Sequence, residues 1–420
     1  MKRYAITIAL VLIIGASLGT YYTLGTDLHL PEYRLQTLEG NPAEAAGLTL
    51  TGSYVGGKGS FSFEVSANGS KRFEPLFWKR WQESDGPLST QPYYSDFHSL
   101  YQEHSKFMRG KSDTYGFYKD QNTLIFAKAS YVKGHDAQQD GTILWNVDAL
   151  DLASGKQTRY TDELSEPAVV ANVFDVQLIG SEVHVLTYVS RINDKVIDKI
   201  YDMKSGKPIR TVQLPIGEPT GPDRELRIEL IADVKPTATN PNVLYIVQEQ
   251  SRISSDNTSN TTMANNLMPV IISEHLYAYH YATEEVKEVP LEADIGENKE
   301  VIPSSHYLEG DTFTTIHVMD EAVTINRYDL SRGQFYPKVT VKADQLGKGR
   351  ISQALIANGR VYVLLQTGDF FENNSMPIAA IADTADGRIL YKGTPVIVKS
   401  NGRPEDQLDD VWLLNIMVQS

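Results

Sequence analysis

The chain has 420 residues, of which 41% are hydrophobic and 22% are charged, a balance typical of folded globular proteins and too apolar for a disordered chain. Its formal net charge is −14, from 39 Lys and Arg against 53 Asp and Glu, so a nucleic-acid backbone would be repelled on average. Cysteine is absent, which excludes disulfides, thiolate metal sites, cysteine nucleophiles and lipidation through cysteine.

Residues 1–27 have the composition of a membrane anchor. An apolar run follows Lys2 and Arg3, and no further charge appears before Asp27. A helix of about 20 residues rises about 30 Å, which is the hydrocarbon thickness of a bilayer. We therefore expect an uncleaved signal-anchor that crosses the cell membrane once, with a cleaved signal peptide or a core helix as the alternatives. The positive-inside bias places the N-terminus in the cytoplasm and residues 28–420 outside it, or secreted if the segment is cleaved.

The body of the chain repeats one turn pattern five times. In each copy an alternating strand ends in Asp, a Gly follows three or four residues later, and a polar residue begins the next strand. The third copy is the weakest, because it has His280 in place of Asp and Glu284 in place of Gly. Successive turns lie about 50 residues apart, except where a Ser/Thr/Asn tract (251–266) lengthens one interval. The five copies are residues 149–156, 200–207, 278–285, 327–334 and 381–388.

This pattern predicts a β-hairpin, because a carboxylate at the strand end can accept backbone N–H bonds and Gly supplies the positive φ of the turn. A second strand is expected upstream of each turn, at 123–129, 183–189, 243–248, 312–318 and 361–366. Four strands in a unit of 40–50 residues is the spacing of a propeller blade. We predict an all-β fold: one extracytoplasmic β-propeller domain of about seven blades (six to eight) over residues 28–420, with clear blades in 123–400.

The stretch 28–122 is less regular. Residues 52–73 alternate and contain a turn at Asn68-Gly69, so they could form the hairpin of one more blade. Residues 77–108 are rich in aromatic side chains and predict either a helical insert or a degenerate blade. The alternative to a single propeller is a pair of smaller β domains joined at the Pro- and Gly-rich segment 215–222.

The repeated string, a hydrophobic residue followed by x-Asp-x-x-Ser/Thr-Gly-Lys/Glu/Gln and a return strand, resembles the blade hairpin of quinoprotein-like (PQQ-type) β-propellers. The resemblance covers residues 123–400 through short motifs and implies the propeller architecture. The chain departs from the enzymes of that family, since Arg159 and Arg210 stand where their blade motif ends in Trp, and it has no vicinal Cys pair. The resemblance therefore implies the fold without implying quinone chemistry.

Local catalytic motifs are missing from the sequence. The glycine-rich segment 56–60 lacks the spacing of a phosphate-binding loop and predicts a hairpin tip. His275 and His280 would point to opposite faces of a strand, so they cannot chelate one metal ion by themselves. No cofactor is predicted. Calcium is the ion that two groups of carboxylates could bind, Asp136 with Asp140 and the cluster Glu405, Asp406, Asp409 and Asp410.

The aromatic segment 77–107, with the cations Lys79, Arg80, Arg109 and Lys111, could stack sugars or contact a protein partner, or it could simply pack an irregular blade. We interpret the chain as a membrane-anchored binding or scaffold module for a protein partner or a cell-envelope component. The alternative is a propeller enzyme, such as a dehydrogenase or lyase, with residues that converge on the central channel. A third interpretation is the sensory ectodomain of a membrane complex. The short cytoplasmic end argues against it, because so few residues could hardly transmit a signal directly.

Overall fold

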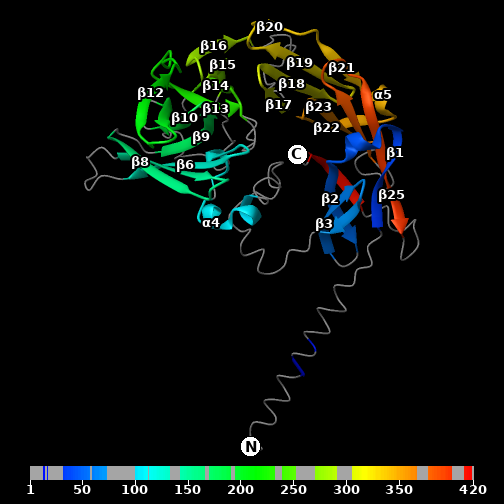
Figure 1. Ribbon diagram of the computed structural model, residues 1–420. Coiled ribbons are helices and arrows are strands. Elements are labelled where there is room, and N and C mark those ends of the chain that lie inside the picture. The colour runs from blue at the N-terminus through cyan, green and yellow to red at the C-terminus, as the bar shows by residue number, and fades with distance from the viewer. Residues whose placement is uncertain are drawn as a thin grey trace, which may run out of the picture.

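The computed structural model of the chain describes residues 13–14, 17, 32–56, 59–72, 100–111, 113–132, 142–165, 170–190, 194–231, 239–251, 270–290, 305–366, 377–399 and 411–418. Over these ranges the fold is all-β, as predicted, and its antiparallel sheets follow one another around an arc (Figure 1). No helix in the described ranges is long and apolar enough to cross a membrane. The predicted anchor lies outside them apart from Ile13, Ile14 and Ser17.

Six sheets, A to F, make up the arc. Sheet C consists of β5 (Phe117–Lys119), β6 (Thr123–Val132), β7 (Thr142–Asp151) and β8 (Gln157–Ser165). Sheet D consists of β9 (Val170–Ile179), β10 (Glu182–Ser190), β11 (Lys195–Asp202) and β12 (Pro208–Leu214). Sheet E consists of β13 (Arg224–Ile231), β14 (Asn242–Ser251), β15 (Ile271–His280) and β16 (Glu285–Val289). Sheet F consists of β17 (Ser305–Glu309), β18 (Thr312–Met319), β19 (Ala322–Asp329), β20 (Gln334–Phe335) and β21 (Val339–Lys342). Sheet A contains β22 (Arg350–Ala357), β23 (Arg360–Gln366), β24 (Ile378–Asp383), β25 (Ile389–Lys399) and β1 (Glu32–Gly40). Sheet B contains β26 (Val411–Val418), β2 (Leu48–Gly56), β3 (Gly59–Ser66) and β4 (Gly69–Arg72).

Neighbouring sheets pack face to face, as the blades of a propeller do. One apolar core lies between each pair in the order C–D–E–F–A–B, and alternate residues of a strand enter the cores on its two sides. Residues 215–223 only connect β12 to β13, across a core that sheets D and E share. Residues 73–99, which join sheet B to sheet C, lie outside the described residues, so the six sheets are the propeller-like part that the structure describes.

The free face of sheet C is covered by a short helical segment. The short helices of the described ranges include η1 (Pro42–Ala45), α4 (Ser105–Met108), η3 (Thr114–Gly116) and α5 (Ala343–Leu346), and residues 100–103 before α4 are helical too. Leu100, Phe107 and Met108 of the α4 region pack against Phe117 and other residues of sheet C. The helical insert predicted from the aromatic segment is thus present at residues 100–108, where the aromatic side chain of Phe107 packs the blade.

The first and last strands, β1 and β26, pair in two neighbouring sheets. β1 pairs with β25 as the outermost strand of sheet A, and β26 pairs with β2 as the innermost strand of sheet B. The hairpin predicted within residues 52–73 is present as β3 and β4 of sheet B. These two strands therefore belong to a blade that the C-terminus completes.

All five repeated turns are present, each between the third and fourth strands of a sheet. The residues at the glycine position have φ between 58° and 73°, including Glu284 at 58°. The leading carboxylates accept backbone hydrogen bonds across the turn, for example from Ser154 N to Asp151 Oδ1 at 2.6 Å. In the divergent copy His280 Nδ1 takes that role and accepts from Thr283 N at 3.2 Å. The predicted physical basis of the repeat is confirmed.

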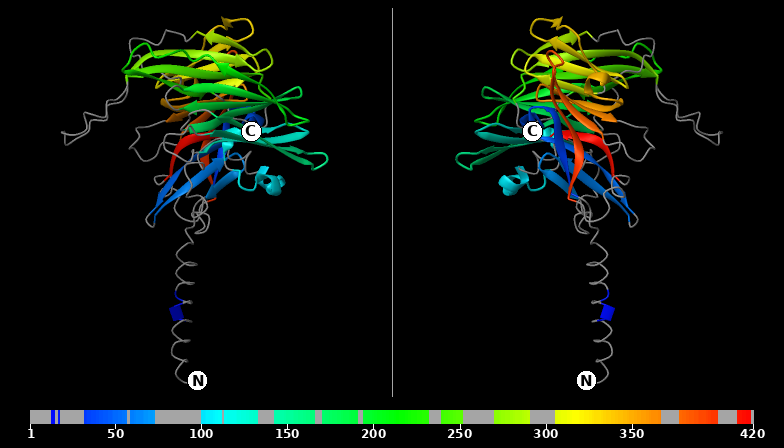
Figure 2. Two further views of the ribbon diagram at one scale, coloured as in Figure 1. Left: turned by 90° about the vertical axis from the view of Figure 1, so that its left-hand side faces the viewer. Right: turned by 90° about the vertical axis from the view of Figure 1, so that its right-hand side faces the viewer.

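The arc has two different faces. The strand ends that the turns at 120–122, 152–156, 180–181, 203–207, 281–284, 310–311, 330–333, 358–359 and 384–388 join lie on one face, which we call the turn face; it carries α4 and faces the viewer in Figure 1. The opposite ends of these strands, from which the chain leads to the next strand or the next sheet, lie on the other face, the loop face. Figure 2 shows the ends of β14 and β15 projecting on the side opposite to α4.

Candidate functional site

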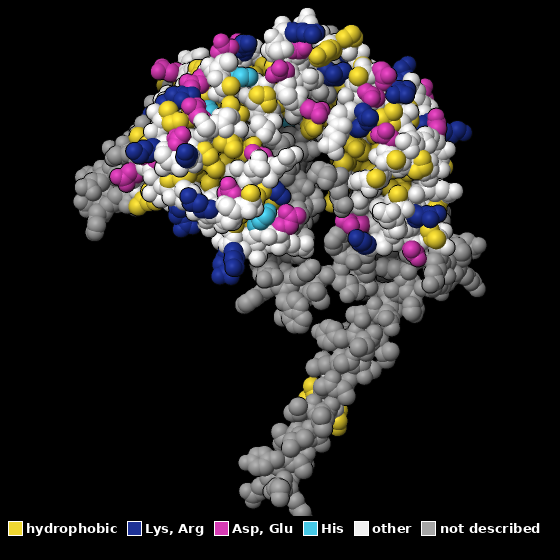
Figure 3. Space-filling model, in the orientation of Figure 1, with side chains coloured by type: hydrophobic (Ala, Val, Ile, Leu, Met, Phe, Trp, Pro, Cys, Tyr) yellow, Lys and Arg dark blue, Asp and Glu magenta, His cyan; other side chains and the backbone are white. Residues whose placement is uncertain are grey.

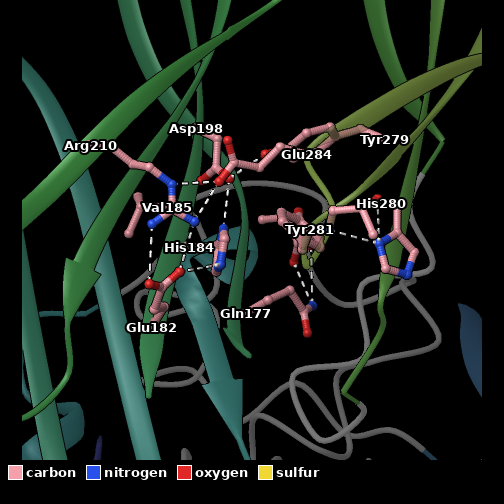
Figure 4. Close-up of polar contacts among 12 residues, drawn as sticks. Gln177, Glu182, His184, Val185, Asp198, Arg210, Tyr279, His280, Tyr281 and Glu284 are labelled. Carbon is pink, nitrogen blue, oxygen red and sulfur yellow. Dashed lines mark hydrogen bonds and ion pairs between the residues drawn. The ribbon is translucent and has the colours of Figure 1, made fainter. Parts of the chain in front are cut away.

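The densest cluster of titratable side chains that the structure describes lies between sheets D and E (Figure 4). Side chains alternate between the two faces of β10 and β11, and this alternation directs His184 and Asp198 into the interface with sheet E. On β10, Val183 and Val185 enter the core shared with sheet C, whereas His184 points to sheet E together with Leu186. Polar residues at inward positions of aliphatic strands therefore meet a partner blade instead of solvent.

The centre of the cluster is a pair formed by His184 and Asp198. His184 Nδ1 lies 2.7 Å from Asp198 Oδ2, and the Tyr279 hydroxyl of β15 donates to the same oxygen at 2.8 Å. His184 is 1% exposed and Asp198 is 0% exposed. Burial and the Asp198 carboxylate hold the pKa of Tyr279 above its usual value, so the phenol stays protonated and remains the donor.

A second carboxylate, Asp175 of β9, lies in the same interface and is partly buried. Tyr281 donates to its Oδ2 at 2.6 Å, and Gln177 Nε2 and the Val176 N–H donate to its Oδ1 at 3.1 and 2.8 Å. Burial raises the pKa of Asp175, and these hydrogen bonds counteract only part of that effect. Gln177 in turn accepts from the backbone N–H of Asn240 at 3.0 Å, which adds another tie to sheet E.

Arg210 closes the cluster at the turn face. Its guanidinium donates to both oxygens of Glu182 at 3.1 and 2.9 Å and also contacts Glu284, the residue with positive φ in the divergent turn. The hydrogen bonds from Arg210 lower the pKa of Glu182 below its usual value, so this carboxylate is ionised at neutral pH. Figure 4 shows His184 between Asp198 and Glu182, whose Oε2 lies 3.9 Å from His184 Nε2.

This arrangement acts as a structural tie. A His, Asp and Tyr set could move a proton, but a general acid or base has to come within hydrogen-bond reach of its substrate. His184 and Asp198 are closed off by Arg210, Glu182 and the packed tyrosines, with the ring of Tyr281 5.3 Å from that of His184. The cluster joins sheets D and E through four polar contacts: Tyr279 to Asp198, Tyr281 to Asp175, Asn240 to Gln177 and Arg210 to Glu284.

A similar tie occurs between sheets C and D. Lys199 Nζ donates to Asp162 Oδ2 at 2.5 Å and lies 4.9 Å from the ring of Trp145. The Trp145 indole, which is fully buried, donates to Thr187 Oγ1 at 2.9 Å. Polar links at successive interfaces fix the blades relative to one another.

The residues singled out in the sequence are not brought together. His275 pairs with Glu288, with Nδ1 2.9 Å from Oε1, whereas His280 bonds within its own turn. Lys111 is buried and binds Asp148 at 2.9 Å, and Arg109 is the residue that ends α4. Gly56 pairs with Gly59 at a hairpin tip, as predicted.

The two carboxylate groups considered for calcium, 136–140 and 405–410, lie outside the described residues, as do Lys79 and Arg80. Within the described ranges, no group of three or more His, Asp or Glu residues is placed to hold a metal ion. The interface cluster was missed because its members are far apart in the sequence. A signal was present in single polar residues inside apolar runs, such as His184 and Asp198.

Comparisons with known proteins add little to this geometry. No protein family matches the chain, and no curated protein is similar to it in sequence. Three solved structures with a similar arrangement share 9% identity with it. An uncharacterized protein from Listeria monocytogenes EGD-e has a TM-score of 0.33 over 67% of each chain. Cobalt-substituted Synechocystis apocarotenoid oxygenase has a TM-score of 0.37 over 88% of this chain and 96% of that one. The β-propeller domain of the Trilobed protease from Pyrococcus furiosus has a TM-score of 0.26 over 88% and 97%. Likeness at this level gives no argument about activity.

Proposed function

We propose that this chain is a membrane-anchored, extracytoplasmic propeller of about seven blades that binds a protein partner through its loop face. The observation that carries the proposal is the position of the exposed aliphatic side chains. Six of those on the body of the protein stand at the loop-face ends of strands in sheets C, D, E and F: Val132, Val170, Val270, Ile271, Ile272 and Met319. Exposed apolar groups gathered on one side of a soluble domain mark an interaction surface.

The turn face has a different character. Its hairpins carry charged residues of both signs, such as Lys156, Lys204, Arg332 and Asp386, and Figure 3 shows Lys and Arg interspersed with Asp and Glu on this side. The exposed apolar residues near it include Leu38, Ile209 and Phe335 of outer strands and Tyr101 beside α4. A mixed-charge surface stays hydrated and monomeric. The difference between the faces supports assigning partner contacts to the loop face.

The interface network supports the same function. A binding surface that is assembled from strand ends of several sheets needs those sheets to hold fixed positions. Arg210, Tyr279 and Tyr281 hold sheet D against sheet E, and Lys199 holds it against sheet C. The alternative, an enzyme with its site in the central channel, would have to use residues other than His184 and Asp198, since these two are buried.

The proposal is tested with the full chain in its native membrane, by placing a photo-crosslinking amino acid at single exposed positions. Met319 and Val132 report on the loop face; Ser205 and Ala153, which are exposed in hairpins, serve as matched controls on the turn face. We expect a discrete adduct from the loop-face positions that is absent from the turn-face positions. Equal adducts from both faces, or adducts from the turn face alone, would refute the assignment.

Two further measurements address the rest of the proposal. The chain should sediment with membranes and require detergent for release, whereas a soluble mature protein that begins near residue 28 would contradict the anchor. A thermal-shift screen of the detergent-solubilised chain against calcium and pyrroloquinoline quinone addresses the enzyme alternative. A ligand at 100 times its dissociation constant adds about 2.7 kcal/mol of stability, so a clear rise of the midpoint would favour that alternative.

A further inference from the structure

The inference concerns one strand edge on the loop face and rests on the proposed function. β15 pairs with β14 along almost its whole length, but β16 pairs only with residues 276–280 of β15. In the part of the chain that the structure describes, residues 271–275 therefore have no strand on their outer side. Every second residue of an antiparallel strand turns its N–H and C=O to that side, where they can pair with another chain.

This half of β15 is less protected than the other outer strands. Glu274 is its one carboxylate, and a register shift leaves Ile272 without a partner residue on β14. β8 carries Arg159 and Glu163, and β12 begins with Pro208 and continues to Arg210. The open edge instead begins with three aliphatic residues in a row, Val270, Ile271 and Ile272, which are 66%, 49% and 43% exposed. An exposed strand edge with aliphatic residues and no partner strand among the described residues is a template on which another chain can pair.

The edge is held ready in an extended conformation. Ser251 N donates to Val270 O at 2.9 Å, and Val270 N donates back to Ser251 Oγ at 3.0 Å, which fixes the start of the strand. Gln248 Nε2 donates to Glu274 Oε2 at 2.5 Å and fixes the middle. A strand that is already ordered loses little conformational freedom when another strand is added.

Charge around the edge selects the partner. Glu274 lies on the open segment itself, and Glu288 of β16 lies beside His275. These two carboxylates favour a cation on the part of an added strand that lies beside residues 274–276.

We propose that the outer edge of residues 271–275 takes up an extended segment of the partner protein as an additional antiparallel strand. The segment has alternating aliphatic residues and a Lys or Arg at the end that lies beside Glu274 and Glu288. Its main chain pairs with the outward-facing N–H and C=O groups of residues 271–275, and its aliphatic side chains cover Ile271 and Ile272. This mode of recognition takes affinity from the backbone and selectivity from alternate side chains.

The test uses the full chain and a fluorescent peptide, acetyl-Lys-Val-Thr-Val-Thr-Val-Lys-amide, followed by anisotropy and by amide hydrogen exchange. We expect saturable binding that slows exchange within residues 271–275, and binding about tenfold weaker when Glu replaces both terminal lysines. The double variant Ile271→Lys/Ile272→Lys should lose at least about tenfold in affinity. Ile209→Lys on β12, also at an exposed aliphatic position (45%), should bind as the wild type does. Matching melting curves would show that both variants fold.

Other results would overturn the proposal. Equal binding by the two variants, or no binding of the peptide, would show that this edge is not the site. Slow exchange of residues 271–275 in the free chain would show that a segment of this chain outside the described residues already covers the edge. A dimer that Ile272→Lys dissociates would assign the edge to a second copy. An adduct at Met319 without peptide binding would retain the proposed function and refute this inference alone.

Discussion

Replacing Glu284 by Gly should give a more stable protein than replacing it by Gln, although Gln is the closer relative of Glu. Glu284 occupies the turn position where the other copies have Gly, with φ at 58°. A residue with a Cβ in this left-handed region costs about 1 kcal/mol, which the Gly variant recovers and the Gln variant retains. Both variants lose the ion pair with Arg210, which is worth about 0.5 kcal/mol because both side chains are about a third exposed and Arg210 keeps Glu182.

The Gly variant should therefore be more stable than the Gln variant by about 1 kcal/mol and close to the wild type. Differential scanning calorimetry of the three proteins would show this as a midpoint difference of about 1 °C for a chain of this size. Gly155→Ala is the matched control, since Gly155 has φ at 70° in the corresponding turn and an added Cβ there meets no atom within 4 Å. It should lose about 1 kcal/mol through backbone strain alone. A Glu284→Gly protein less stable than Glu284→Gln would refute the reasoning and show that the strain is smaller than the interactions that Gln retains.

Three further predictions concern the interfaces. Burial holds the pKa of Asp175 above its unfolded value, so wild-type stability falls as pH rises through that window. Asp175→Asn should remove this component, and its stability relative to wild type, measured by urea unfolding from pH 4 to 7, should increase with pH; a constant difference would contradict the raised pKa. Tyr279→Phe removes a donor to the buried Asp198 carboxylate and should cost about 1–3 kcal/mol in the same assay, and a change within error would show that the bond contributes nothing. Ile416→Ala in β26 should cost about 2–5 kcal/mol, because Ile416 is buried between sheets A and B, whereas the exposed Asn415→Ala should change stability by less than about 0.5 kcal/mol. Similar losses for the two would argue against the observed register of β26.

Local turn chemistry made much of the fold predictable. Asp202 and Gly206 stand in one short segment, and the carboxylate contact and the positive φ that they impose involve only neighbouring residues. The expected strands at 183–189 and 361–366 are present as β10 and β23 for the same reason, since period-two alternation is a local signal.

Pairing between distant segments could not be predicted. β1 adds to sheet A and β26 to sheet B, and nothing in residues 32–40 or 411–418 specifies which strand each will meet. The cluster between sheets D and E is hidden for a related reason. Alternation shows that His184 and Asp198 face inward, but the register between blades decides that Tyr279 and not another residue meets them.

The pairing of β26 with β2 also has a consequence for biosynthesis. Val418 pairs with Leu48, so β26 completes a sheet to which a strand from much earlier in the sequence belongs. Closing a loop of this length costs about 5 kcal/mol of chain entropy, which can be recovered only after β26 has been synthesised. A stalled or truncated product would leave the edge of β2 bare and open to proteases. The pairing of β26 with β2 therefore acts as a check on synthesis, in which only chains that extend through β26 reach the stable state.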